Sequence, residues 1–204
     1  LNVLKNMNIK YRFDVINFLI DYLNYNSYLE IGVGNRVCFD KIHIEKKISV
    51  DPSTKGSPCF LGTSDIFFEK NKSTYDIIFI DGLHCHKQVR KDITNSLNIL
   101  NNNGTIVVHD VYPLNEIQQY PPAQRITRQW TGDVWREWVR LRATEKNLNM
   151  FTVLLSNLEE TVGIIRSGKQ TPITPPSNIT YEYFDQNRET LLNVISAEKI
   201  TNHL

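Results

Sequence analysis

Two hydrophobic patterns alternate along the first half of the chain: apolar residues at helical spacing, and short runs that are almost continuously apolar. Helical spacing predicts a lead-in helix over residues 12–25 and a later helix that carries Val89, Ile93 and Leu97 and stops at residues 101–104. The remaining pattern predicts short helices at residues 36–42 and 66–70, strands at 28–32, 47–50, 75–81 and 105–109, and a short strand running into a polar turn within 59–65.

The run at residues 75–81 is typical of a central parallel strand, because both of its faces are apolar. Strands that alternate with helices at this rhythm imply a parallel α/β sheet with right-handed crossovers. The first half of the chain is therefore expected to form a Rossmann-like sheet with helices on both faces.

The second half of the chain departs from this rhythm. Residues 132–144 are predicted to form a helix, and residues 150–155 and 161–166 to form two strands joined by a turn short enough for a hairpin. The sheet is thus expected to be mostly parallel with an antiparallel last strand. A proline-rich connector at residues 171–176 precedes a closing helix predicted over residues 181–197.

Residues 111–131 show no clear periodicity and are rich in Pro and Gln. A loop of this length within a compact domain is usually functional. We therefore expect it to form a lid over a substrate.

Length and composition favour a single globular domain over residues 1–204, and the Leu at position 1 suggests a domain excised from a larger protein. The formal net charge of +1 and the lack of a long basic run argue against a nucleic-acid partner. No apolar stretch is long enough to span a bilayer, and no secretory signal opens the chain. Cys38, Cys59 and Cys85 have no metal-type spacing and are expected to be reduced thiols of a cytoplasmic protein.

The strand at residues 28–32 ends in a Gly-x-Gly turn formed by Gly32 and Gly34, and Asp51 ends the next strand. In an open parallel sheet such glycines let the backbone approach a nucleoside, and the carboxylate takes the ribose hydroxyls. The leading Glu30 and the Val37 that replaces a third glycine favour S-adenosylmethionine (SAM) over a dinucleotide.

The chain resembles class I SAM-dependent methyltransferases, and more narrowly the small-molecule and sugar O-methyltransferases that include macrolide-sugar and catechol-type enzymes. The resemblance spans about residues 12–166 and is carried by an ordered set of segments, at residues 28–32, 50–52, 62–65, 79–84, 88–92, 104–110 and 132–135. The predicted antiparallel hairpin also separates this sheet from the dinucleotide-binding one.

The resemblance implies a role for each matching residue. Glu30, Gly32 and Gly34 would surround the methionine part of SAM, and Asp51 would hold the ribose. Ser64 and Asp65 would lie against the adenine, Asp81 and Asp110 would bind magnesium, and His84 would be the general base, with Asp81 at both the cofactor and the catalytic site.

One departure from these relatives concerns the metal ion. They have a third polar ligand next to the fifth-strand aspartate, whereas His109 and Val111 flank Asp110 here. Magnesium prefers oxygen ligands in near-octahedral geometry, and a histidine would favour zinc or manganese instead. The sequence leaves open whether Mg²⁺ or another divalent cation is needed.

The residues also allow plainer interpretations. His84 could cap the following helix, Asp51 could cap a turn, and Asp92 could be a polar face residue. His86 is expected to face solvent. The three tryptophans could pack in the core, and this is expected at least for Trp138. Arg125, Arg128 and Arg136 could grip a phosphate or an acidic sugar, or could be solvated.

The sequence therefore predicts an O-methyltransferase that acts on a hydroxyl of a sugar or glycan, a reaction that needs a base or a metal ion because such hydroxyls have a very high pKa. The alternatives are a magnesium-dependent, catechol-like small-molecule O-methyltransferase, a nicotinamide-dependent oxidoreductase and a non-catalytic SAM-binding domain. The oligomeric state and the acceptor itself do not follow from the sequence.

Overall fold

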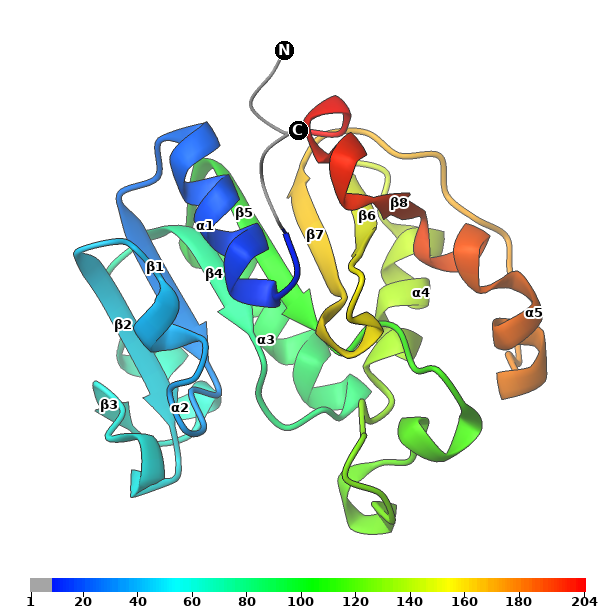
Figure 1. The fold of residues 1–204 in the computed structure, drawn as a ribbon, viewed down its shortest axis with the longest axis horizontal. Helices are drawn as coiled ribbons and strands as arrows, with labels where there is room; N and C mark the ends of the chain where they lie inside the picture. The colour runs from blue at the N-terminus through cyan, green and yellow to red at the C-terminus, as the bar shows by residue number, and fades with distance from the viewer. Residues whose placement is uncertain (1–8) are drawn as a thin grey trace.

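The computed structural model describes residues 9–204, and residues 1–8 of the predicted domain lie outside the described residues. Within residues 9–204, eight strands form one sheet in the order β3-β2-β1-β4-β5-β7-β6-β8 (Figure 1). The strands are β1 (Ser27–Ile31), β2 (Lys46–Asp51), β3 (Phe60–Leu61), β4 (Tyr75–Ile80), β5 (Leu100–His109), β6 (Leu148–Leu154), β7 (Val162–Ser167) and β8 (Val194–Ser196). The helices are α1 (Arg12–Leu23), α2 (Ser64–Lys70), α3 (His86–Ile99), α4 (Val134–Thr144) and α5 (Tyr181–Leu192).

The central strands are buried on both faces, as their continuous apolar runs predict. Alternate residues of β4 enter two separate cores: Ile77 and Phe79 pack with α1, and Ile78 and Ile80 pack with the buried faces of α3 and α4. Figure 1 shows α1 in front of the sheet and α3 and α4 behind it. The expected Rossmann-like α/β sheet with helices on both faces is confirmed.

The predicted hairpin is also confirmed, since β7 runs antiparallel to both β5 and β6. The strand β8 was not expected. The closing helix ends at Leu192 rather than at residue 197, because Asn193 adopts a left-handed conformation (φ 51°) and turns the chain into a short strand parallel to β6.

Three local predictions need correction. The expected helix at residues 36–42 is only a short 3₁₀ turn, η2 (Phe39–Lys41). The helix α2 begins two residues earlier than predicted, because the Thr63 hydroxyl caps it by accepting a hydrogen bond from the Ile66 N–H. The strand β5 begins at Leu100, directly after α3, and its register against β4 shifts between Tyr75 and Ile77.

The loop at residues 111–131 contains two 3₁₀ turns, η4 (Glu116–Gln119) and η5 (Pro122–Gln124). The Gln118 carbonyl accepts hydrogen bonds from the N–H groups of Thr131 and Gly132, so the turn η4 is tied to the end of the loop. No helix in residues 9–204 is long and apolar enough to cross a membrane.

Candidate active site

The carboxyl ends of β1, β2, β4 and β5 meet at one edge of the sheet, where open α/β sheets bind ligands. Two cavities lie at this edge, one of about 420 Å³ over β1, β2 and β4 and one of about 360 Å³ over β4 and β5. We call them the glycine cavity and the charged cavity. Asp81, which directly follows β4, lines both of them.

Backbone and small residues build most of the glycine cavity. Gly32 has φ of +89°, and a Cβ placed there would lie 2.1 Å from the Asp81 carbonyl oxygen, so only glycine fits. Gly34 also has a positive φ, but a Cβ there would meet nothing within 4 Å. The turn therefore leaves open space at Gly34 through which a ligand can approach the backbone.

Asp51 lines the glycine cavity and also holds the glycine turn. Its carboxylate accepts hydrogen bonds from the Gly34 N–H at 2.9 Å and from the Ser53 N–H at 2.7 Å. Asp51 therefore both caps the glycine turn and lines the cavity.

Ser64 and Asp65 also line the glycine cavity. The Gln88 side-chain amide links them, since its Nε2 lies 3.2 Å from Ser64 Oγ, 2.9 Å from Asp65 Oδ1 and 3.1 Å from Asp92 Oδ1. Asp92 could be a polar face residue of its helix by sequence alone. In the structure it is buried and lines this cavity. Its position one turn after Gln88 on α3 was the available signal.

Glu30 lines neither cavity. It is 1 % exposed and accepts a hydrogen bond from the Tyr28 hydroxyl, because residues two apart on β1 share a face. Burial raises the pKa of Glu30 to about 8, and the nearby Asp81 adds to the shift. Its predicted contact with SAM stays a prediction.

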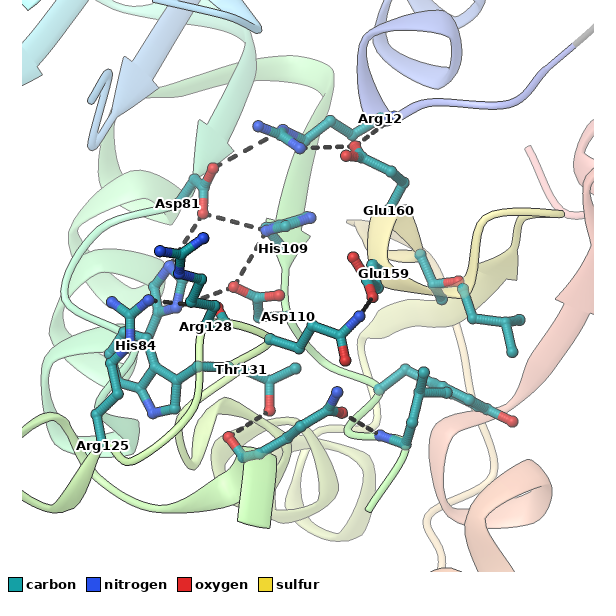
Figure 2. Close-up of a pocket in the computed structure, with 17 residues that line it drawn as sticks. Arg12, Asp81, His84, His109, Asp110, Arg125, Arg128, Thr131, Glu159 and Glu160 are labelled. Atoms are coloured by element: carbon teal, nitrogen blue, oxygen red, sulfur yellow. Dashed lines mark hydrogen bonds and ion pairs between the residues drawn. The ribbon is translucent and has the colours of Figure 1, made fainter. Parts of the chain in front are cut away.

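In the charged cavity, a cluster of ion pairs surrounds His84 (Figure 2). His84 Nε2 lies 3.0 Å from Asp81 Oδ1, and His84 Nδ1 lies 2.9 Å from Asp110 Oδ2. His109 Nδ1 lies 3.2 Å from Asp81 Oδ1 and 3.1 Å from Asp110 Oδ2. The sequence predicted that Asp81, His84 and Asp110 gather at the strand ends, and the structure brings them together.

This cluster shifts the protonation of its members. Burial lowers the pKa of both histidines, but Asp110 and Asp81 outweigh it and raise the pKa of His84 to about 9 and that of His109 to about 10. Burial raises the pKa of Asp110, but His109 and His84 outweigh this effect and lower the pKa to about 2. At neutral pH His84 is thus an imidazolium, and it can accept a proton only after it has lost one.

The backbone around this cluster is unusual. His84 has φ of 54° and Asp110 has φ of 59°, both in the left-handed region that non-glycine residues rarely adopt. Strained positions of this kind occur preferentially at functional sites. The turn after β4 and the turn after β5 thus aim both side chains at the same point.

Arg12 and Glu160 complete the charged cavity and were not identified from the sequence. Arg12 Nη1 donates to Glu160 Oε2 at 2.6 Å, and Arg12 Nε lies 3.8 Å from Asp81 Oδ2. Glu160 follows β6, whereas Arg12 begins α1, so no local motif links them. For Trp130, core packing was the plainer interpretation, whereas its ring stacks on His84 with centroids 4.8 Å apart.

The residues present do not fit Mg²⁺. Asp81, His84 and Asp110 could offer three ligand atoms within 4.8 Å of one another, but one of the three is a nitrogen and the side chain of Val111 supplies no further oxygen. Both carboxylates already face His84 and His109, so a cation would have to replace these contacts.

A second group of metal-type side chains lies beside this site, formed by Cys85, His86 and Asp133. Asp133 accepts a hydrogen bond from the His86 N–H at 2.6 Å and also pairs with the His86 ring. This pairing joins the start of α3 to the start of α4. His86, expected to face solvent, is thus held by a carboxylate.

Comparisons with known proteins agree with this architecture. A family model described as a methyltransferase domain matches residues 47–111, which is less than half of the chain. No curated protein matches the sequence.

Three solved structures illustrate the similarity in fold. A putative O-methyltransferase from Klebsiella pneumoniae is 11% identical (TM-score 0.56, covering 76% of this chain and 79% of that one). An O-methyltransferase from Bacillus cereus in complex with SAH is 12% identical (TM-score 0.55, covering 78% and 80%). A putative caffeoyl-CoA O-methyltransferase from Staphylococcus aureus is 18% identical (TM-score 0.56, covering 76% and 82%). The chain thus has the fold of these O-methyltransferases, and the domain match over residues 47–111 supports a methyltransferase.

Proposed function

We propose that this protein is a SAM-dependent O-methyltransferase whose acceptor is a hydroxyl group of a sugar or glycan. The observation that carries the proposal is the pair of adjoining cavities that share Asp81. A methyl donor in the glycine cavity and an acceptor in the charged cavity would meet beside this carboxylate. Holding two reactants in contact supplies a large part of the catalysis of a transfer reaction.

The glycine cavity has the features that SAM needs. Its volume of about 420 Å³ lies within the usual range for small-ligand sites. The open space at Gly34 admits a ligand close to the backbone, and Asp51 is placed to accept hydrogen bonds from ribose hydroxyls. Ser64 and Asp65 lie at the same cavity and would contact the adenine. Bound SAM would supply the activated methyl group.

The charged cavity suits an acceptor with several hydroxyl groups. Its lining combines carboxylates, imidazoles and arginines with the Trp130 ring, and the loop at residues 111–131 contributes part of it, consistent with a substrate lid. Such groups both donate and accept hydrogen bonds, as a sugar requires. A screen of sugar and catechol acceptors for methyl transfer tests the sugar assignment.

His84 is the proposed general base: because both ring nitrogens face a carboxylate here, one of Asp81 and Asp110 would orient the ring and the other would give way to the acceptor hydroxyl. Only the imidazole that has lost its proton can take the proton of the acceptor hydroxyl. The raised pKa of His84, about 9, makes the remaining imidazole a stronger base for a hydroxyl of very high pKa. His109 and Arg12 keep positive charge near the reacting oxygen.

Calorimetric titration of the full chain with SAM tests the proposal. We expect micromolar binding that weakens at least about tenfold in Asp51→Ala, since each hydrogen bond to a charged group contributes about 1.5–3 kcal/mol. Methyl transfer is then screened with neutral and acidic sugars and with catechol, each with Mg²⁺ and with a chelator. Transfer to catechol alone, dependent on Mg²⁺, would favour the catechol-like alternative. Absence of SAM binding would contradict the proposal.

A further inference from the structure

Two arginines of the loop between β5 and α4 face the charged cavity. Arg125 and Arg128 line this cavity and do not line the glycine cavity. In Figure 2 both are drawn on the same side of the cavity as His84, whereas Glu159 and Glu160 lie across from them. Their charges are therefore presented to the acceptor and not to the cofactor.

Arg125 is held in place before any ligand arrives. Its Nε donates to the Thr127 carbonyl oxygen at 3.0 Å, and its Nη2 lies 3.3 Å from the Arg128 carbonyl oxygen. Its guanidinium also lies 4.9 Å from the centre of the Trp130 ring. A side chain fixed in this way loses less conformational entropy when it binds a ligand.

The stack continues from Arg125 to the proposed base. The Trp130 ring lies 4.8 Å from the His84 ring, and its indole N–H donates to the Tyr120 carbonyl oxygen at 2.6 Å. The Trp130 ring thus contacts both the guanidinium of Arg125 and the ring of His84, beside which the reacting hydroxyl would lie. A group bound by Arg125 would belong to the same small molecule as that hydroxyl.

Carboxylates of the protein do not neutralise these two arginines. Among residues 9–204, no carboxylate forms an ion pair with Arg125 or Arg128. The carboxylates that line the charged cavity have other partners: Asp81 and Asp110 face the histidines, Glu160 binds Arg12, and Glu159 accepts from the Gln129 amide.

We propose that the acceptor carries an acidic group, a carboxylate or a phosphate, which Arg125 and Arg128 bind while its hydroxyl faces His84. This inference rests on the proposed function, because it takes the charged cavity as the acceptor site. Guanidinium groups bind both kinds of anion through paired N–H donors. The acceptor is therefore an acidic sugar, either a uronic acid or a sugar phosphate.

An NMR titration of the full chain tests the inference, with the Arg125 Nε–H and the Trp130 indole N–H as reporters. The probes are D-glucuronate, D-glucose 6-phosphate and neutral D-glucose. We expect at least one acidic sugar to bind roughly five- to tenfold more tightly than glucose, as two exposed charge pairs allow. The tighter of the two acids identifies the group as carboxylate or phosphate.

The double variant Arg125→Gln/Arg128→Gln should lose this preference and bind the acids like glucose. Lys169→Gln, which removes one positive charge from an exposed residue outside both cavities, should keep it. If the acids bind the wild type no better than glucose, or if the double variant keeps the preference, the inference is wrong.

SAM titration of the same preparations separates the two proposals. Unchanged SAM binding in the double variant together with a lost anion preference supports the inference. A wild type that prefers the acids but does not bind SAM would overturn the proposed function and leave the anion site standing.

Discussion

The glycine cavity and the charged cavity share Asp81 but are built in different ways. Residues close together in sequence form the core of the first: the turn at Gly32 and Gly34 is closed by Asp51 from the next strand along the chain. The second gathers charges from α1, from the turns after β4 and β5, and from the β6–β7 connection. On the proposed function, binding of the cofactor would depend on backbone shape, whereas recognition of the acceptor would depend on side chains from distant segments.

The largest expected effect comes from the glycine turn. Gly32→Ala places a Cβ 2.1 Å from the Asp81 carbonyl oxygen at φ +89°, and should lower the free energy of unfolding by more than about 3 kcal/mol and abolish SAM binding. Gly34→Ala is the matched control, because its Cβ meets nothing within 4 Å, and should cost only about 1–2 kcal/mol. Denaturant unfolding measures both, and equal costs would show that the close approach at Gly32 is unimportant.

The pH dependence of methyl transfer probes the charged cavity. Because the pKa of His84 is raised to about 9 and only the deprotonated ring is a base, turnover should rise about tenfold per pH unit below pH 9 and level off above it. The measurement is the rate with saturating SAM and acceptor from pH 6 to pH 10. A rate that levels off near pH 6.5, the ordinary pKa of histidine, would mean that His84 is not coupled to Asp81 and Asp110 in this way.

A smaller effect is expected from Glu30, which lies outside both cavities. Its pKa of about 8 in the folded state exceeds the ordinary value of 4.5, so folding keeps a proton that the unfolded chain releases. Stability should therefore fall as the pH rises from 4.5 to 8 and stay level above that, with a cost of about 3 kcal/mol at pH 7.

Glu30→Gln should remove most of this cost and flatten the dependence of the unfolding free energy on pH. Tyr28→Phe is the opposing control, because it removes the hydroxyl that donates to Glu30 and should lower stability. If Glu30→Gln leaves the pH dependence unchanged and abolishes SAM binding, Glu30 contacts the cofactor as the resemblance implies.

The sequence predicted the sheet because each central strand carries its own signal, a continuous apolar run that holds wherever the strand lies in the sheet. It missed β8, since a three-residue strand exists only where β6 offers an edge to pair with. It also ended α3 in a loop at residues 101–104, whereas Leu100 pairs with Tyr75 and Thr105 with Ile77, so the segment between them is part of β5. Tertiary pairing decided both cases.

At the candidate site, Asp81, His84 and Asp110 could be predicted to meet because strand ends converge in a parallel sheet. Arg12, Glu160 and Trp130 could not, because α1, the β6–β7 connection and the loop at residues 111–131 bring them to the site from distant parts of the chain. The raised pKa of His84 was equally hidden, since it depends on the distances to two carboxylates that lie on different strand ends.

We infer that the glycine cavity binds SAM and that the charged cavity holds the acceptor and its base, with Asp81 between them. A comparison of Asp51→Ala with His84→Ala tests this division directly. SAM affinity by calorimetry and single-turnover methyl transfer are measured for both variants. The account predicts that Asp51→Ala weakens SAM binding, whereas His84→Ala keeps it and slows transfer by roughly 10²-fold or more. If both variants bind SAM and transfer methyl groups like the wild type, or if His84→Ala loses only SAM binding, the division between the cavities is contradicted.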